Sequence, residues 1–88
     1  MDTSSAIAFL GLAAGLCTTL AFVPQVRRTW TTRSADDISL GMLIVFLAGV
    51  FLWLLYGLAL GAWPIVLANA ATFVLAGSIL YFKLVVRR

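Results

Sequence analysis

The sequence predicts an all-α integral membrane protein in which three transmembrane helices form a bundle. Apolar residues make up 64% of the 88 residues and charged residues only 10%, well outside the ranges of soluble domains. The charged residues occur only at Asp2, within residues 27–37 and from Lys83 onward. The apolar sequence between them holds three blocks, each able to supply the ~20 residues that cross a bilayer. A chain of this length forms at most one small domain, so we expect residues 1–88 to be a single transmembrane unit.

We expect the spans at about residues 5–26, 38–60 and 63–86. The first residues lack a basic region, so the first block is predicted to be a span and not a cleavable signal peptide. Ser34 and Asp37 are spaced as a capping box that would start the second helix, which accounts for Asp37 without a functional role. The two-residue link at 61–62 makes the second and third helices antiparallel neighbours. The longer first loop would allow the third helix to lie between the other two.

The basic residues indicate how the chain is oriented in the membrane. All six follow the first span or the third: Arg27, Arg28, Arg33, Lys83, Arg87 and Arg88. With three spans these two regions lie on the same side, whereas the N-terminus and the second link carry no Lys or Arg. The positive-inside rule then predicts an external N-terminus and a cytoplasmic C-terminus. This placement beside lipid, rather than in one basic patch, argues against a nucleic-acid partner.

The first span ends in an unusual polar stretch that contains Pro24 and Gln25. Proline removes one helical hydrogen bond and clashes with the carbonyl four residues earlier, here that of Leu20. The pair is therefore either a tolerated kink or a working hinge. Earlier in the same span, Gly11 and Gly15 permit a close approach of helices, either for packing within the bundle or for a dimer seam. Helical spacing puts Thr18, Phe22 and Gln25 on the same face as these glycines.

The sequence lacks the side chains that most enzymes need. It contains no His, no Glu and no Asp within a predicted span, so we expect no catalysis, no metal site and no cofactor. Cys17 is the single cysteine; we expect a packed small residue there, the alternative being a reactive thiol.

Trp53 and Asn69 are predicted to meet inside the membrane. Trp53 lies seven residues before the end of the second span and Asn69 six after the start of the third, so both lie roughly 9–10 Å below the outer boundary. An aromatic face and an amide suit a neutral polyol or sugar. The alternative is that Asn69 only joins helices. Because three helices cannot enclose a path for a sugar, a transporter requires at least a dimer, and the charge bias makes that dimer parallel.

Four further stretches of the sequence are informative together: CTTLAFVPQ at 17–25, TRSADDIS at 32–39, WLLYG at 53–57 and ANA at 68–70. In these stretches the chain resembles the SemiSWEETs, bacterial half-size relatives of the SWEET sugar transporters in the PQ-loop group. The resemblance implies a helix packing order of 1-3-2 and a parallel homodimer that forms a six-helix transporter with alternating access. It also implies a sugar site at Trp53 and Asn69, a hinge at Pro24 and Gln25, and a location in a bacterial inner membrane.

The resemblance implies further pocket or gate residues at Phe22 and Met42, and the W-x-x-Y-G stretch adds Tyr56 as a candidate beside Thr18. The uncharged spans lack the titratable group that proton-driven transporters carry, so we expect facilitated diffusion (uniport) of a monosaccharide or disaccharide. Three alternatives remain: a PQ-loop carrier of another small solute, a multidrug exporter and a non-transporting scaffold subunit. The uncharged spans argue against zwitterionic substrates and against the exporter.

Overall fold

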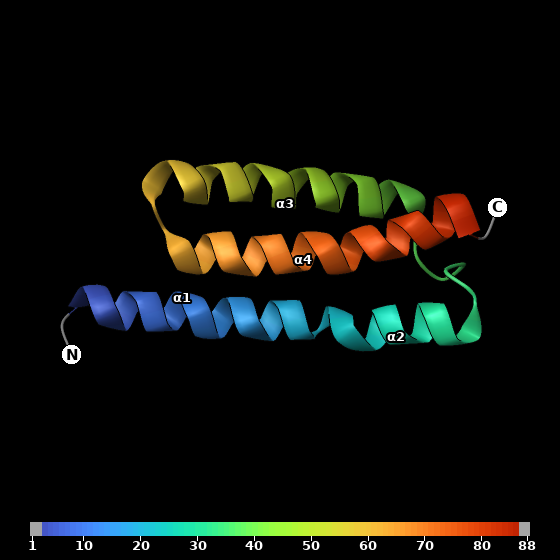
Figure 1. Ribbon diagram of the computed structural model, residues 1–88, viewed down its shortest axis with the longest axis horizontal. Coiled ribbons are helices and arrows are strands. Elements are labelled where there is room, and N and C mark those ends of the chain that lie inside the picture. The colour runs from blue at the N-terminus through green and yellow to red at the C-terminus, as the bar shows by residue number, and fades with distance from the viewer. Residues whose placement is uncertain (1–2, 87–88) are drawn as a thin grey trace.

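The computed structural model describes residues 3–86, and all of its regular structure is helical (Figure 1). The elements are α1 (Thr3–Leu20), α2 (Phe22–Thr32), α3 (Leu40–Leu60), α4 (Trp63–Tyr81) and η1 (Phe82–Val86), the last a π-helical turn. Together they form three helices long and apolar enough to cross a membrane, Thr3–Thr32, Leu40–Leu60 and Trp63–Val86. The bundle is 50 Å long, which matches the ~40–45 Å of a bilayer with its headgroups.

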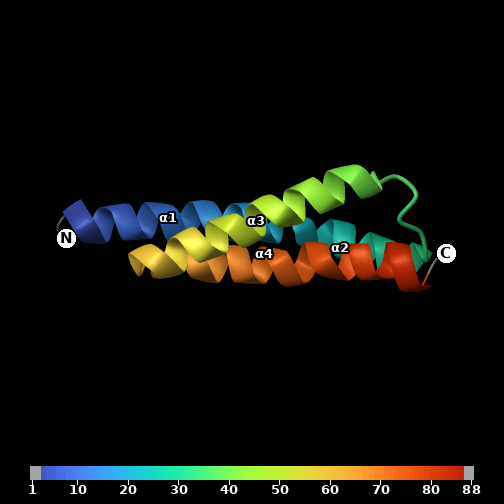
Figure 2. The same cartoon turned by 90° about the horizontal axis from the view of Figure 1, so that it is seen from above.

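The third span lies between the first two, which confirms the packing order 1-3-2. α4 packs on α3 along one side and on α1 and α2 along the other (Figure 1). Seen from above, α3 is inclined to the other helices (Figure 2). Among the described residues α1 and α3 share no substantial contact of their own. α4 is therefore the common surface on which the other two spans are mounted.

Small residues and hydroxyl groups hold α1 against α4. A Cβ at Gly15 would overlap the Cβ of Ala68, and one at Gly11 would lie 3.6 Å from the Cβ of Pro64. The Thr19 hydroxyl donates to the carbonyl oxygen of Ala68 at 3.2 Å. The glycine pair thus serves packing within the chain, the first of the two interpretations left open by the sequence.

The first span is interrupted at Ala21, and it is longer than predicted. α1 ends at Leu20 and α2 begins at Phe22. The break falls where Pro24 withholds the N–H that would bond to the Leu20 carbonyl. The helix continues past residue 26, the expected end of the span, because α2 ends at Thr32. A helix can continue through charged residues, because its backbone hydrogen bonds do not require apolar side chains. Arg27 and Arg28 accordingly lie in the second-last turn of α2.

The connection between α2 and α3 differs from the predicted capping box. Ser39, not Ser34, is the N-cap of α3, and its hydroxyl accepts the N–H of Met42 at 3.2 Å. Ser34 instead accepts the N–H of Asp36 at 3.3 Å, a local turn bond. The second span accordingly starts at Leu40, two residues after the expected position, because the serine next to the apolar run captures the free N–H.

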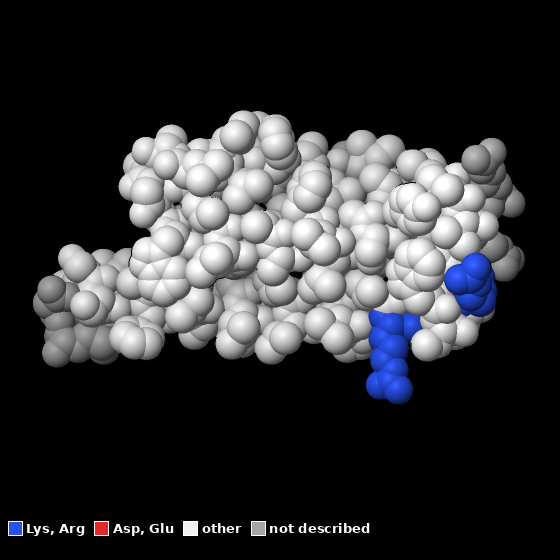
Figure 3. Space-filling view, viewed as in Figure 1, with Lys and Arg blue, Asp and Glu red and all other residues white. Residues whose placement is uncertain are grey.

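Aromatic and basic side chains close the end of the bundle formed by α2 and η1. The Trp30 ring meets that of Phe82 edge-on, with 5.0 Å between the centroids. Arg33 adopts a left-handed conformation (φ 58°) that ends α2, and its guanidinium lies 5.3 Å from the centre of the Phe82 ring. The Lys83 ammonium donates to the Ala35 carbonyl at 3.0 Å. On the face shown in Figure 3, Lys and Arg gather only at this end.

Candidate functional site

A groove of about 480 Å³ runs along the bundle between α1 and α3, with α4 as its floor. Its volume lies in the range of small-molecule sites. Trp53 on its α3 wall is 55% exposed, so the groove is open on one side. The lining residues are Gly11, Gly15, Thr18, Phe22, Val45, Phe46, Gly49, Val50, Trp53, Pro64, Ile65, Ala68, Asn69 and Thr72.

Four of the residues singled out from the sequence line this groove together: Thr18, Phe22, Trp53 and Asn69. They come from α1, α2, α3 and α4, one from each element. The predicted convergence of Trp53 and Asn69 therefore appears in the structure, and it follows from the antiparallel pairing of α3 and α4 about the tight link at Gly61.

The Trp53 ring is oriented by its neighbour Tyr56. The two rings meet edge-on, with 5.3 Å between centroids and 87° between planes. Gly49, one turn before Trp53, would have nothing within 4 Å of an added Cβ, so there is open space beside this wall. A broad aromatic face over open space provides a stacking surface for an apolar or C–H-rich face of a ligand.

Within residues 3–86, the amide of Asn69 bonds to its own helix and not to another one. Its amide Nδ2 donates to the Ile65 carbonyl one turn earlier, at 2.9 Å. The hydrogen bonds that join helices at this depth come from Thr19, whose hydroxyl lies 2.8 Å from that of Thr72. The alternative in which Asn69 joins helices therefore has no support in the described part of the chain, and its carboxamide oxygen and second N–H are available to the groove.

The groove carries no ionisable side chain among its lining residues. Its polar groups are an amide, two hydroxyls and an indole N–H, surrounded by glycine and apolar side chains. Such a surface can hold a neutral ligand with several hydroxyl groups, but it offers no charge to compensate an ion. It contains neither a nucleophile paired with a base nor a set of metal-ligating groups.

Other predicted site residues lie outside this groove. Tyr56 lines an adjoining pocket with Gly49, Leu52 and Trp53. Gln25 lines a separate polar pocket near the Arg28–Asp37 ion pair, where 3.6 Å separates the charged atoms. Met42 lies on the first turn of α3 and is 49% exposed.

The expectation that Cys17 is packed was wrong for the single chain, because its side chain is exposed. Asp2, Arg87 and Arg88 lie outside the described residues. Of the basic residues from which the membrane orientation was predicted, the structure therefore describes Arg27, Arg28, Arg33 and Lys83.

Thr72 lines the groove, although the sequence did not single it out as a site residue. It lies one turn after Asn69 on the same face of the helix, and the structure buries it against Thr19. The available signal is its i+3 spacing from Asn69, which places both residues on one face of a helix. Its pairing with a hydroxyl on another helix could not be read from the spacing.

Known proteins resemble this chain in both sequence and fold. The model of the PQ loop repeat matches residues 6–66. The sugar transporter SemiSWEET of Bradyrhizobium diazoefficiens is 51% identical over 78 residues, covering 89% of this chain and 91% of that protein. The SemiSWEET of Leptospira biflexa is 44% identical over 75 residues, covering 85% of this chain and 88% of its own.

Two solved structures have the same fold as this chain. A crystal structure of SemiSWEET in the inward-open conformation superimposes with a TM-score of 0.86 and 39% identity, covering 96% of this chain and 90% of that one. The crystal structure of a bacterial homologue of SWEET transporters superimposes with a TM-score of 0.83 and 36% identity, covering 89% of this chain and 94% of that one.

The fold and these likenesses define a multi-pass α-helical membrane protein with a PQ loop repeat, which belongs to a transporter class and not to an enzyme class. The chain belongs to the SemiSWEET family.

Proposed function

We propose that this protein is a uniporter that moves a neutral monosaccharide or disaccharide down its gradient, by alternating access across a parallel homodimer. The observation that carries the proposal is the convergence of Trp53 and Asn69 in one uncharged groove. Stacking on the indole would bind the C–H face of a sugar, and the amide would bind its hydroxyl groups. The sugar transporters named SemiSWEET that this chain resembles support the same substrate class.

The groove of one chain is only half of a transport path. Its floor and two walls come from this chain, and its remaining side is open. A second copy in the same orientation would close that side and bring a second Trp53 and Asn69 to the same depth, about an axis along the membrane normal. A parallel dimer is also what the charge bias predicts.

Movement of α2 would open and close the path. α1 is anchored on α4 up to Thr19, and the helix is interrupted immediately after it, at Ala21. Phe22, the first residue of α2, lines the groove and packs on Phe46 of α3 with 5.1 Å between ring centroids. Rotation at the break, next to Pro24 and Gln25, would carry Phe22 towards or away from the sugar. Met42 and Tyr56 would then act at the two ends of the path.

Facilitated diffusion follows from the absence of a titratable group in the path. Between Asp37 and Lys83 the sequence contains no charged residue and no histidine, so no side chain there can bind and release a proton at physiological pH. We place the N-terminus outside and the basic end, with Lys83, in the cytoplasm.

Uptake of radiolabelled glucose and sucrose into proteoliposomes tests the proposal. We expect saturable uptake by the wild type and loss of uptake in Trp53→Ala and Asn69→Ala. Trp63→Ala is the matched control for the first variant, because Trp63 is 53% exposed but lies outside the groove. Ser78→Ala is the control for the second, since Ser78 bonds to a carbonyl of the same helix, as Asn69 does.

Two results would contradict the proposal. Well-inserted wild type that takes up neither sugar would indicate another neutral solute or a scaffold subunit. Accumulation of sugar above the external level when a pH gradient is imposed would exclude a uniporter, because only coupling to protons could drive it.

A further inference from the structure

The hydroxyl groups that line the groove have already donated their hydrogens inside the protein. A threonine hydroxyl carries one hydrogen and two acceptor lone pairs. The hydroxyl of Thr18 donates its hydrogen to the carbonyl oxygen of Gly15 at 3.1 Å, one turn earlier on α1. What Thr18 can offer to a ligand in the groove is therefore a lone pair and not a hydrogen.

The same is true of Thr72, through its contact with Thr19. Thr19 donates its only hydrogen to the Ala68 carbonyl, at 3.2 Å. The Thr19 and Thr72 oxygens are 2.8 Å apart, so a hydrogen must lie between them. When both bonds form together, the single hydrogen of Thr19 lies on the Ala68 carbonyl, and the hydrogen between the two hydroxyl oxygens comes from Thr72. The remaining hydrogen-bonding capacity of Thr72 is again acceptance only.

Asn69 adds one acceptor and one donor. Its Nδ2 has one hydrogen on the Ile65 carbonyl, which leaves the second hydrogen and the carboxamide oxygen. The indole of Trp53 can donate but cannot accept. The side-chain oxygens of Thr18, Asn69 and Thr72 can therefore each accept a hydrogen bond, and the hydrogens of the two hydroxyls lie in bonds within the protein.

We propose that Thr18 and Thr72 are specificity-determining residues that recognise substrate hydroxyl groups through the hydrogens of those groups. The inference rests on the proposed function, since it names which atoms of the sugar the groove reads. The preferred substrate is an underivatised sugar whose hydroxyls are free to donate. Replacement of a recognised hydroxyl by fluorine, or its methylation, removes the hydrogen and leaves two acceptors opposed.

A panel of sugar analogues tests this directly. The wild type is assayed for uptake of radiolabelled glucose or sucrose, whichever it transports, in competition with each monodeoxy and each monofluoro derivative of that sugar. Where the protein group is a donor, the fluoro derivative is tolerated because fluorine can still accept weakly. Where the protein group is an acceptor, the fluoro and the deoxy derivatives both bind poorly, because neither carries the hydroxyl hydrogen. We expect at least two hydroxyl positions at which the deoxy and fluoro derivatives compete equally poorly, roughly two- to tenfold worse than the parent.

Variants then assign the positions. Thr18→Val and Thr72→Val keep the shape of the side chain and remove the oxygen; each should abolish the penalty at one position. Thr18→Ser and Thr72→Ser keep the hydroxyl and should retain the penalty. In Thr72→Val the Thr19 hydroxyl still bonds to Ala68, so α1 stays attached to α4, and a thermal melt in detergent checks this.

The possible outcomes distinguish a failure of this inference from a failure of the proposed function. Fluoro derivatives that compete as well as the parent at every position would overturn the inference while the sugar-uniporter function stands. A penalty that persists in one valine variant removes that threonine from the assignment. Failure of the wild type to take up either parent sugar would instead overturn the proposed function on which the inference depends.

Discussion

Gly15 of α1 lies directly against Ala68 of α4, with no room between them for another carbon atom. This contact brings α1 close enough for the Thr19 hydroxyl to reach the Ala68 carbonyl of the neighbouring helix. The same approach places Thr18 at the wall of the groove and Asn69 on its floor. One small residue thus sets both the packing of the first and third spans and the width of the groove.

The substitution Gly15→Ala should destabilise the bundle. Its new methyl group must displace Ala68, and overpacking of this kind costs about 1–3 kcal/mol. Gly77→Ala is the control, because a Cβ at Gly77 meets nothing within 4 Å. Thermal unfolding in detergent is the measurement, and Gly15→Ala combined with Ala68→Gly should recover most of the loss. An unchanged melting temperature for Gly15→Ala alone would show that the two helices are not in close contact.

Pro24→Ala should slow transport while it strengthens the first helix. Alanine restores the N–H that Pro24 lacks, and the helix gains up to about 3 kcal/mol. If rotation at the break is needed for each transport cycle, the maximal uptake rate should fall roughly tenfold for every 1.4 kcal/mol by which the straight form is favoured. Uptake kinetics give the rate, and Val23→Ala on the preceding residue is the control. Equal maximal rates in Pro24→Ala and wild type would exclude a hinge here.

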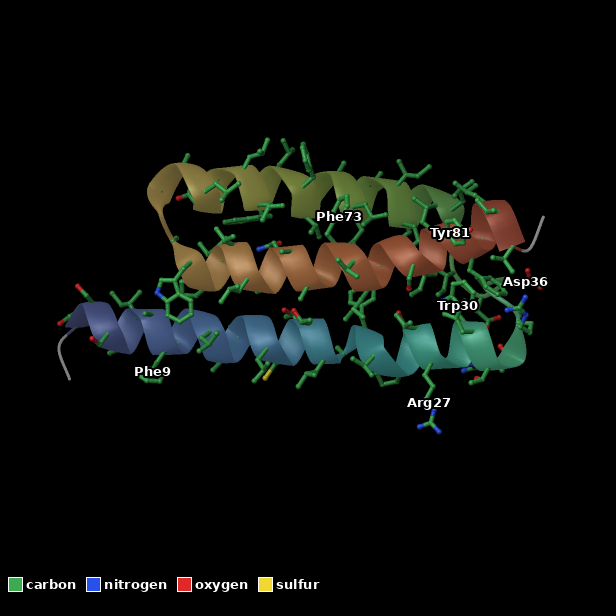
Figure 4. The ribbon with its side chains drawn as sticks, viewed as in Figure 1. Phe9, Arg27, Trp30, Asp36, Phe73 and Tyr81 are labelled. Carbon is green, nitrogen blue, oxygen red and sulfur yellow. The ribbon has the colours of Figure 1, made fainter. Side chains whose placement is uncertain are left out.

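Lys83→Met should loosen the end of the bundle formed by α2 and η1. The variant loses the hydrogen bond from the Lys83 ammonium to the Ala35 carbonyl, worth about 1.5–3 kcal/mol for a charged donor. Arg27→Met is the matched control: it removes one positive charge from the same end, but Arg27 points away from the bundle (Figure 4). Amide hydrogen exchange of residues 29–38 should rise in Lys83→Met alone. Equal exchange in both variants would mean that only the charge matters.

Cysteine labelling should reveal the orientation of the chain. In a Cys17→Ala background, Ser4→Cys at the start of α1 should react with a membrane-impermeant maleimide added to intact cells. Thr32→Cys at the end of α2 should react only after the cells are opened. Both positions are exposed in the structure, so access is decided by the side of the membrane. The reverse labelling pattern would invert the proposed topology.

Uptake should not depend on pH across the range in which histidines and most perturbed carboxylates titrate, about pH 5.5 to 8. The groove is lined by no group that changes charge there. Initial rates measured at equal internal and external pH provide the check. A sigmoidal pH profile with a single midpoint would reveal a coupled proton that the groove residues do not account for.

The sequence was sufficient for most of the architecture, because the membrane leaves few choices. A bilayer accepts long apolar helices and little else, so composition predicted three spans, and the short link at Gly61 predicted that the second and third are neighbours. The layer shared by Trp53 and Asn69 followed from counting residues along two antiparallel helices. The likeness to a known family supplied the packing order that the structure confirms.

The sequence failed at the helix ends, where several residues compete for the same role. Ser34 and Ser39 are both good N-caps, and only the folded loop shows that Ser39 bonds to Met42. Nothing in the chain marks Arg33 for a left-handed conformation, because the rings of Trp30 and Phe82 that hold its guanidinium come from separate elements.

The sequence by itself determined that this protein crosses the membrane three times, that its spans are uncharged and that an indole and an amide share one depth. Only the tertiary structure decided which hydroxyls donate and which accept. That assignment requires the Thr19 and Thr72 oxygens to be 2.8 Å apart on different helices. Residue spacing fixes the face of a helix, but the partner of a hydroxyl on another helix depends on how closely the two helices approach, which here is set by the contact of Gly15 with Ala68.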